Sequence, residues 1–178
     1  SPAADPHSTS PTLATGQDSL KIINVAGYID NNSAQTLIIG AHYDHLGDGH
    51  SGFSLSTEGG IHNGADDNAS GVSSLLWLAE RLSKVKKLKT NVLFIAFSGE
   101  EFGLHGSKAF VDRPTIPLES ISAMFNMDMV GRLTDDKLII QGADTAKEFK
   151  PILDKLNADE FKFKLTHNPG GFGPSDHA

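Results

Sequence analysis

The sequence predicts an α/β fold of three layers, in which helices cover both faces of a mixed, largely parallel central sheet. Two observations lead to this prediction. Residues 92–97 form the unbroken apolar run Val-Leu-Phe-Ile-Ala-Phe, which is typical of a strand covered on both faces. Strand patterns and helical patterns also alternate along the chain, and this alternation is typical of a layered α/β domain.

The composition excludes several classes of protein and of site. A length of 178 residues predicts one domain with a sizeable core. The net charge of −7 argues against nucleic acid as the main partner, because phosphate binding needs a basic surface. No apolar run reaches membrane-spanning length, and no signal-peptide pattern is found. The absence of cysteine means that any metal must be bound by His, Asp or Glu.

The first part of the chain predicts a terminal segment followed by two strands. Residues 1–18 are rich in Pro, Ser, Thr and Ala, and we expect a linker or disordered segment before a folded domain at 19–178. Strand patterns cover residues 20–29 and the more buried run 36–41. A long Gly- and Ser-rich loop follows at residues 47–64, and loops of this length are often functional.

A helix is predicted after this loop, with Asn68 or Ser70 as its N-terminal cap. Its core-facing stripe, at helical spacing, consists of Val72, Leu75, Leu76, Ala79 and Leu82. The strand at 92–97 comes next. The later elements that we expect are a helix at 105–111 ended by Arg113 and Pro114, strands at 121–129 and 137–141, a helix at 146–156, and a lysine-protected edge strand at 161–165.

Residue types that bind metals gather where the predicted strands end or a helix begins. They are His42 after the 36–41 strand, Asp66 and Asp67 before the first helix, Glu100 and Glu101 after the 92–97 strand, Asp128 near the end of the 121–129 strand, and His177 in the last loop. Because strand ends converge on one edge of such a sheet, we expect these side chains to lie together.

This set of side chains suits zinc, which accepts imidazole nitrogen and carboxylate oxygen in open catalytic sites. One zinc ion would need about three protein ligands and a water. Five ligands with one bridging carboxylate would instead fit two ions that share a water, and a carboxylate left over would be the general base. Consecutive side chains point in different directions, so Glu100 and Glu101 need not have the same role.

Each of these residues also has an ordinary structural interpretation. His42 could be a core histidine with satisfied hydrogen bonds, and His177 could be a surface residue. Asp67 could be a charge that stabilises a helix N-terminus. Asp128, which has a methionine on each side, is harder to explain in this way. A carboxylate within an apolar strand is costly unless it is paired or bound to a metal.

Five blocks that contain these residues resemble the co-catalytic zinc aminopeptidases, a family that includes secreted bacterial leucine aminopeptidases. The blocks are Gly-Ala-His-Tyr-Asp-His at 40–45, Asn-Gly-Ala-Asp-Asp-Asn-Ala-Ser-Gly at 63–71, Ser-Gly-Glu-Glu-Phe-Gly-Leu at 98–104, Asn-Met-Asp-Met-Val-Gly at 126–131 and Ser-Asp-His at 175–177. They occur in the order of the family and extend over most of the chain. The predicted domain at 19–178 would then be a zinc peptidase catalytic domain.

The resemblance implies a role for each residue and two zinc ions per chain. His42 and Asp128 would bind one ion, Glu101 and His177 would bind the other, and Asp67 would bridge the two. Glu100 would be the general base that takes a proton from the zinc-activated water. Asp44 would orient the His42 imidazole from outside the ligand set. By the same comparison, His45, His50, His62 and His105 match no ligand position.

The sequence departs from the family in one respect that concerns the metals. Family members usually continue past the last histidine with a further strand and helix, whereas this chain ends one residue after His177. On this pattern we expect a chain truncated at its C-terminus, in which the second metal is held less firmly.

The resemblance favours an aminopeptidase that hydrolyses the N-terminal peptide bond of peptides with a free N-terminus, with no nucleic acid or membrane as partner. It also implies a secreted or periplasmic location. Phe53 and the 170–173 segment could line the substrate pocket. The alternatives are an enzyme like the glutaminyl cyclases, which use a single zinc ion, and a peptidase-like binding module without activity. The presence of all five ligand types favours the aminopeptidase.

Overall fold

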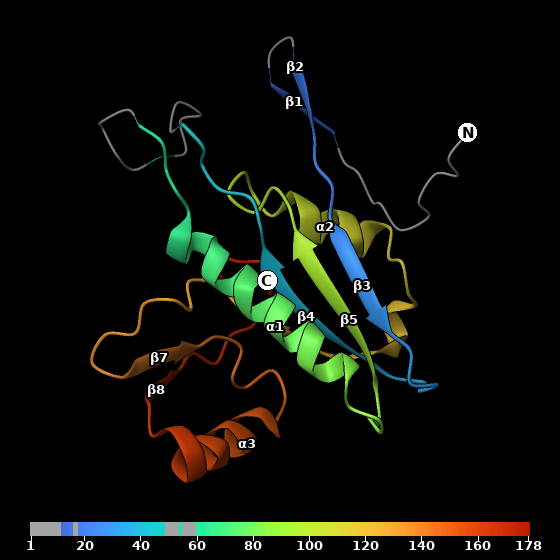
Figure 1. Cartoon of the computed structure of the whole chain (residues 1–178), viewed down its shortest axis with the longest axis vertical. Helices are drawn as coiled ribbons and strands as arrows, with labels where there is room; N and C mark the ends of the chain where they lie inside the picture. The colour runs from blue at the N-terminus through green and yellow to red at the C-terminus, as the bar shows by residue number, and fades with distance from the viewer. Residues whose placement is uncertain (1–11, 16–17, 49–53, 55–59) are drawn as a thin grey trace.

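The computed structural model describes residues 12–15, 18–48, 54 and 60–178, and a four-stranded sheet lies at its centre (Figure 1). The strands are β3 (Val25–Ile29), β4 (Thr36–His42), β5 (Asn91–Phe97) and β6 (Ile121–Asn126), in the order β3-β5-β4-β6. β4 is parallel to both β5 and β6, and β3 is antiparallel to β5. The predicted mixed, largely parallel sheet is therefore confirmed.

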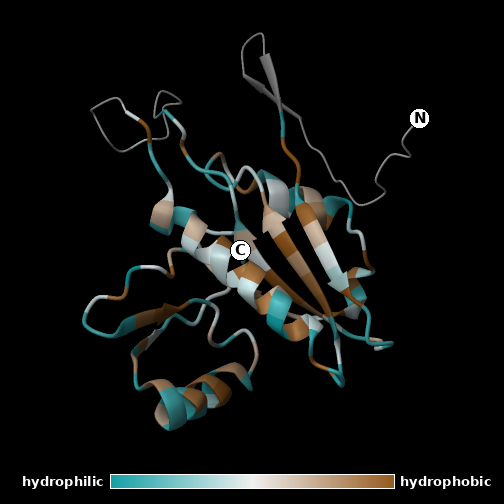
Figure 2. Cartoon of the chain, in the orientation of Figure 1, coloured by the Kyte–Doolittle hydropathy of each residue, from teal (hydrophilic) through white to brown (hydrophobic). Residues whose placement is uncertain are grey.

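Helices cover the two faces of this sheet, which confirms the predicted three layers. The helix α1 (Gly71–Ser83) packs its Leu75 with Ile39 and Phe94 on one face. The helix α2 (His105–Asp112) packs its Phe110 with Leu93 and Phe97 on the other. Figure 2 shows the apolar character of the central strands between the two helices. Because β5 contributes to both clusters, its apolar run is continuous rather than alternating.

The predicted strand at 20–29 is two strands separated by a bend. β2 (Asp18–Lys21) pairs with β1 (Thr12–Thr15), and the chain then bends before β3. At the bend Ile22 is buried, and the Asn24 side chain donates to the Gly106 carbonyl and accepts from the Ser98 amide. These contacts draw the segment away from a continuous strand. Thus part of the predicted linker at 1–18 is a strand, and residues 1–11, 16 and 17 lie outside the described residues.

The helix α1 differs from its prediction in one position of the apolar stripe. Leu76 is 65% exposed, whereas Leu78 packs against the core together with Val72, Ala79 and Leu82. The stripe is therefore rotated relative to the predicted one. The short helical segment η1 (Ala65–Ser70) precedes α1, and the Asn68 side chain accepts the Gly71 amide at 3.0 Å. Of the two residues predicted as the cap, Ser70 lies at the N-cap position without a side-chain capping hydrogen bond, and Asn68 accepts the amide of the first residue of α1 instead.

The strand predicted at 121–129 ends early, so Asp128 lies in the loop that follows β6. The Met127 amide still donates to the Gly40 carbonyl at 2.9 Å. Met129 then adopts a left-handed backbone conformation with a φ of 54°, which turns the chain away from the sheet. Asp128 is thus carried by a turn at the sheet edge rather than by the strand itself.

The last part of the chain forms a smaller layer beside the main sheet (Figure 1). β7 (Lys137–Ile140) and β8 (Lys164–His167) pair in parallel, and α3 (Phe149–Leu156) with η3 (Asn157–Phe161) lies between them in sequence. The strand predicted at 161–165 begins later than expected, because Phe161 ends η3. The short η2 (Leu118–Ser120) precedes β6. Among the described residues, no helix is long and apolar enough to cross a membrane.

Candidate metal centre

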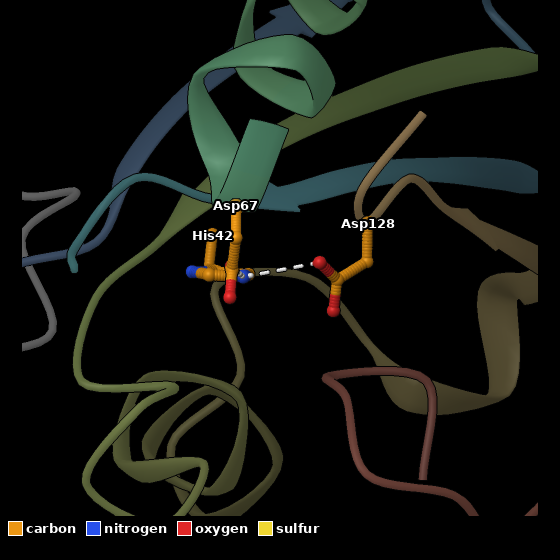
Figure 3. A group of neighbouring side chains, drawn as sticks. All are labelled: His42, Asp67 and Asp128. Atoms are coloured by element: carbon orange, nitrogen blue, oxygen red, sulfur yellow. Dashed lines mark hydrogen bonds and ion pairs between the residues drawn. The ribbon is translucent and has the colours of Figure 1, made fainter. Parts of the chain in front are cut away.

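His42 lies at the centre of the candidate site, fully buried at the end of β4 (Figure 3). Its Nδ1 atom lies 3.2 Å from the carbonyl oxygen of Asp44. Its Nε2 atom lies 3.2 Å from Asp67 Oδ1, 3.4 Å from Asp128 Oδ1 and 3.9 Å from Glu100 Oε2. One imidazole nitrogen therefore faces three carboxylates that come from three separate segments of the chain.

The carboxylates around His42 determine its protonation when no cation is bound. Burial disfavours the charged imidazole and lowers its pKa. The hydrogen bond to Asp128 and the charges of Glu100, Asp128 and Asp44 act in the opposite direction and outweigh it, which raises the pKa of His42 to about 9. The ring thus holds a proton that a bound cation would displace, since a metal ligand must be the neutral imidazole.

One buried asparagine connects the two segments that carry the aspartates of the site. Asn68 is 2% exposed and follows directly after Asp67. Its side chain donates to the Met127 carbonyl at 3.0 Å and accepts the Met129 amide at 3.2 Å, on either side of Asp128. The sequence predicted Asn68 only as a helix cap. Its contact with the 127–129 loop depends on the fold and had no signal in the sequence.

The two adjacent aspartates of η1 have different partners, although they look alike in the sequence. Asp67 faces His42, whereas Asp66 Oδ1 accepts the Gly131 amide at 2.8 Å. Asp66 also lies 3.9 Å from Arg132, measured from Oδ2 to Nε. Asp66 therefore fixes the loop that carries Asp128.

Asp44 fixes the segment that carries the two glutamates. Its carboxylate accepts the Glu100 amide at 3.2 Å through Oδ1 and the Glu101 amide at 3.3 Å through Oδ2. The same carboxylate is 3.8 Å from His42 Nδ1, so the closer contact to the ring comes from the Asp44 carbonyl. Asp44 therefore contacts the imidazole and both glutamates.

Glu100 and Glu101 follow β5 through a tight turn. Gly99 has a φ of +74°, and a Cβ atom there would lie 2.7 Å from Ile22 Cδ1, so the turn requires glycine. Burial raises the pKa of Glu100 to about 7; the charges of Asp128, Asp176 and Glu101 add to this effect, and His42 opposes it. Burial and the charge of Asp67 raise the pKa of Glu101, against the contact with His45.

A second group of side chains that could hold a metal ion shares Asp67 with the first. The possible ligand atoms of His42, Asp67 and Asp128 all lie within 4.8 Å of one another, and so do those of His45, Asp67 and Glu101. Within the second group, His45 Nδ1 lies 2.6 Å from Glu101 Oε1. Asp67 thus belongs to both groups, and His45, which was not predicted as a site residue, lies beside Glu101.

His177 lies outside both groups. Its Nε2 atom is buried and has no hydrogen-bond partner among the described residues. Burial lowers the pKa of His177, and the charge of Asp128 opposes that effect. The neighbouring Asp176 is 3% exposed, and burial raises its pKa to about 6 against a contribution from Ser107. Asp176 and His177 line a cavity of about 560 Å³ with apolar side chains of α2 and β6.

The donor atoms around His42 fit a zinc ion in type and in spacing. Zinc binds nitrogen and oxygen ligands at about 2.0–2.2 Å, so neighbouring ligands in a tetrahedral shell lie roughly 3.3 Å apart. The distances from His42 Nε2 to Asp67 and Asp128 are 3.2 Å and 3.4 Å. With Nδ1 donating to the Asp44 carbonyl, Nε2 either carries a proton toward the carboxylate oxygens or, as a neutral ligand, shares a cation with them.

Comparisons with known proteins agree with this chemistry. A model of peptidase family M28 matches residues 24–178. The chain is 28% identical over 166 residues to a probable leucine aminopeptidase of Arthroderma otae, in an alignment that covers 89% of this chain and 43% of the relative.

Two solved structures show the same arrangement of elements. A zinc aminopeptidase from Bacillus subtilis superposes with a TM-score of 0.64 at 28% identity, covering 90% of this chain and 37% of that one. The glutaminyl cyclase of Porphyromonas gingivalis superposes with a TM-score of 0.72 at 21% identity, covering 96% and 63%. The second likeness concerns the fold alone. The chain spans less than two thirds of each of these relatives.

Proposed function

This chain belongs to peptidase family M28, and on that premise we propose that residues 19–178 are the catalytic unit of a zinc-dependent aminopeptidase. One observation carries the proposal: three carboxylates lie within 3.9 Å of the single nitrogen Nε2 of His42. This arrangement supplies ligands for a cation and a base beside it. The substrate would be a peptide with a free N-terminus, from which the first residue is released.

The proposal includes two zinc ions per chain. His42 and Asp128 would bind the first ion, and Asp67 would bridge the pair. Glu101 would bind the second ion, together with an imidazole that the family resemblance assigns to His177. When bound, zinc polarises a carbonyl group and lowers the pKa of a water molecule beside it.

Glu100 would transfer the proton that hydrolysis requires. Its carboxylate is not grouped with the metal-binding side chains, yet Oε2 lies only 3.9 Å from His42 Nε2. In the metal-free chain burial raises the pKa of Glu100 to about 7, and a carboxylate in this place can accept and release a proton. The proton passes from the attacking water to a Glu100 oxygen, and then to the nitrogen of the leaving amine. The C–N bond thus breaks to give a neutral amine.

Replacement of Glu100 tests this role. Glu100→Gln keeps the size of the side chain but cannot accept the proton, so we expect turnover of an aminoacyl reporter substrate to fall roughly 100-fold to 10,000-fold. Zinc content should not change, because Glu100 is not a proposed ligand. The matched control is Glu119→Gln, an exposed glutamate of η2. Undiminished turnover in Glu100→Gln would remove Glu100 from the mechanism.

A glutaminyl-cyclase reaction is the second candidate, favoured by one observation. The group of His42, Asp67 and Asp128, in which only His42 is buried, could by itself hold a single ion. Mass spectrometry of a peptide with N-terminal glutamine separates the two reactions. Loss of the whole residue indicates an aminopeptidase, and loss of ammonia indicates a cyclase. A chain that binds zinc but alters neither this peptide nor the reporter would be a binding module.

The secreted or periplasmic location that the resemblance implies is also part of this proposal. Fractionation of cells that express the full-length protein checks it. Recovery of the protein with the cytoplasmic markers would overturn the proposed location without affecting the proposed chemistry.

A further inference from the structure

The end of α1 and the turn that leads from it into β5 carry a dense group of cations. Within residues 81–89 the basic residues are Arg81, Lys84, Lys86, Lys87 and Lys89, and all of them are exposed. The chain as a whole has a net charge of −7, so this stretch, which we call the basic turn, opposes the overall charge. Cations do stabilise the last turn of a helix, but α1 ends at Ser83 and most of these residues lie beyond it.

Nearby carboxylates do not neutralise the basic turn. Lys84 pairs with Glu80, one helical turn earlier. Asp30 lies in the adjoining turn between β3 and β4, where the Asn31 side chain donates to the Thr90 carbonyl. The lysines within 86–89 have no ion-pair partner among the residues that the structure describes. An excess of positive charge therefore faces solvent at this end of the molecule.

Apolar side chains are exposed beside these cations. Val85, within the turn, is 45% exposed, and on the outer face of α1 Leu76 and Trp77 are 65% and 54% exposed. The guanidinium carbon of Arg81 lies 5.0 Å from the centroid of the Trp77 ring, so the indole adjoins the basic turn. A surface that combines cations with an indole and aliphatic groups is typical of proteins that bind the headgroup region of a membrane.

The basic turn and the candidate metal centre lie at opposite ends of the central sheet. β4 and β5 are parallel, with Thr36 beside Asn91 at one end and His42 beside Phe97 at the other. The turn leads into Asn91, whereas His42 and Glu100 lie at or just after the other ends of these strands (Figure 1). One edge of the sheet is therefore acidic and the opposite edge is basic. Such an asymmetry orients a molecule on a negative surface, with the acidic edge away from it.

We propose that the basic turn, together with Trp77 and Val85, docks this chain on an anionic lipid bilayer, with the candidate metal centre directed away from the membrane. The lysines contact the lipid phosphates, and the indole lies at the level of the headgroups. Nucleic acid would need the cations alone, so the exposed apolar side chains favour the bilayer. The proposal departs from the expectation that no membrane is a partner, because a peripheral contact needs no spanning helix.

The fluorescence of Trp77 tests this contact without any substitution, because Trp77 is the only tryptophan of the chain. The probe is a vesicle of phosphatidylcholine with about 30% phosphatidylglycerol, which is an anionic lipid. We expect these vesicles to shift the emission to shorter wavelength, and lipids with brominated acyl chains to quench it, because the indole enters a less polar layer. Vesicles of phosphatidylcholine alone should cause neither change.

The effect of salt and the vesicle-bound fraction complete this measurement. Raising the salt concentration to about 0.5 M should release the chain, because it screens the attraction between the lysines and the lipids. The absence of binding to the anionic vesicles overturns the proposal. Sedimentation of the chain with these vesicles at an unchanged Trp77 emission also overturns it, because the chain would then dock by another face.

Replacement of four lysines by glutamine separates the position of the charge from its amount. The test variant combines Lys84→Gln, Lys86→Gln, Lys87→Gln and Lys89→Gln. The matched control combines Lys147→Gln, Lys150→Gln, Lys155→Gln and Lys164→Gln, which are exposed lysines of the smaller layer and its helix. Both variants change the net charge equally, and circular dichroism checks that both keep the fold.

We expect the test variant to bind the anionic vesicles at least about 100-fold more weakly, since each lysine near the membrane surface contributes roughly fivefold. The control should lose less than about tenfold, because its lysines lie outside the proposed contact and salt screens them. Equal losses in the two variants overturn the proposal, as does unaltered binding of the test variant.

A short DNA duplex tests whether the basic turn binds nucleic acid instead. Fluorescence anisotropy of a labelled duplex at about 0.15 M salt should show no binding that the test variant loses. Binding to the duplex without binding to the vesicles overturns the bilayer as the partner. None of these measurements uses turnover or zinc, so their outcome is independent of the proposed peptidase function.

Discussion

At the residue scale, Asn68 does more than contact the start of a helix, because it also connects the segments that hold Asp67 and Asp128. Its buried amide contacts three backbone groups, in the loop around Asp128 and at the first residue of α1. We expect Asn68→Ala to lower the free energy of unfolding by about 2–4 kcal/mol, because these groups lose their partner in a buried place. Chemical denaturation of the metal-free protein measures this loss.

The same change should weaken zinc binding, because Asp67 and Asp128 are no longer held at a fixed separation. Asn157→Ala is the matched control: that side chain also makes two local backbone contacts, to the amide and the carbonyl of Phe163, but lies in η3. It should lower stability and leave the zinc affinity unchanged. Equal zinc affinities in the two variants would show that the aspartates find their places without Asn68.

The sequence alone could identify most residues of the candidate site by their chemistry but not by their contacts. His42 and Glu100 follow long apolar runs, so their position at the sheet edge was predictable. His45 was not, because its contact with Glu101 depends on how two turns fold back toward each other. His177 was expected among the ligands, and its place outside the two groups depends on the path of the last loop.

At the element scale, the start of α1 is packed too tightly for a side chain. A Cβ atom on Gly71 would collide with the Asn68 side chain and the Met127 carbonyl oxygen. Alanine normally stabilises a helix relative to glycine, but here we expect Gly71→Ala to cost about 1–3 kcal/mol through overpacking. Thermal unfolding should show the change as a lower Tm.

Gly27→Ala is the control for this prediction. Nothing lies within 4 Å of a Cβ atom placed on Gly27, in the edge strand β3. That substitution should leave the Tm unchanged or raise it, because alanine reduces the entropy of the unfolded chain. A Tm for Gly71→Ala at or above that of the parent protein would mean that the loop around Met127 moves aside freely.

The boundaries of helices and strands were predicted well where burial determines them. They were predicted poorly where a side-chain hydrogen bond or a backbone turn determines them. β4 and β5 are buried along nearly their whole length, and their apolar runs marked them clearly. The bend after β2 depends on the Asn24 side chain, and the early end of β6 depends on the turn at Met129. Such single contacts carry no periodic signal in a sequence.

At the scale of the whole molecule, the carboxylates and His42 make stability depend on pH when no metal is bound. The pKa of Glu100 is raised from 4.5 to about 7, that of Asp176 from 3.8 to about 6, and that of His42 from 6.5 to about 9. In each case the folded chain holds its proton more tightly than the unfolded chain. The stabilisation is complete below the unfolded pKa and is lost as the pH rises through the folded one.

We therefore expect the metal-free chain to become less stable between about pH 5 and pH 9. The pKa of Asp128 is lowered from 3.8, so its contribution to stability is lost only at a pH below this window. The pKa of His177 is lowered from 6.5, so this residue makes stability rise with pH, but only below pH 6.5. Urea unfolding in the presence of a chelator measures the slope. Glu100→Gln should flatten it below pH 7, and added zinc should reverse it, because a cation favours the deprotonated ligands. A stability that rises with pH in the chelated protein would contradict the raised pKa values.

The strand order has a consequence for how the protein folds. β4 lies between β5 and β6, and the three strands are far apart in sequence. The proposed metal ligands lie at the end of β4 or just after β5 and β6, so the proposed site cannot assemble until both long-range parallel pairings have formed. Such non-local pairings are slow steps in folding. During refolding, tight zinc binding should therefore begin only when the central sheet is complete. We expect no rapid zinc uptake before the strands pair.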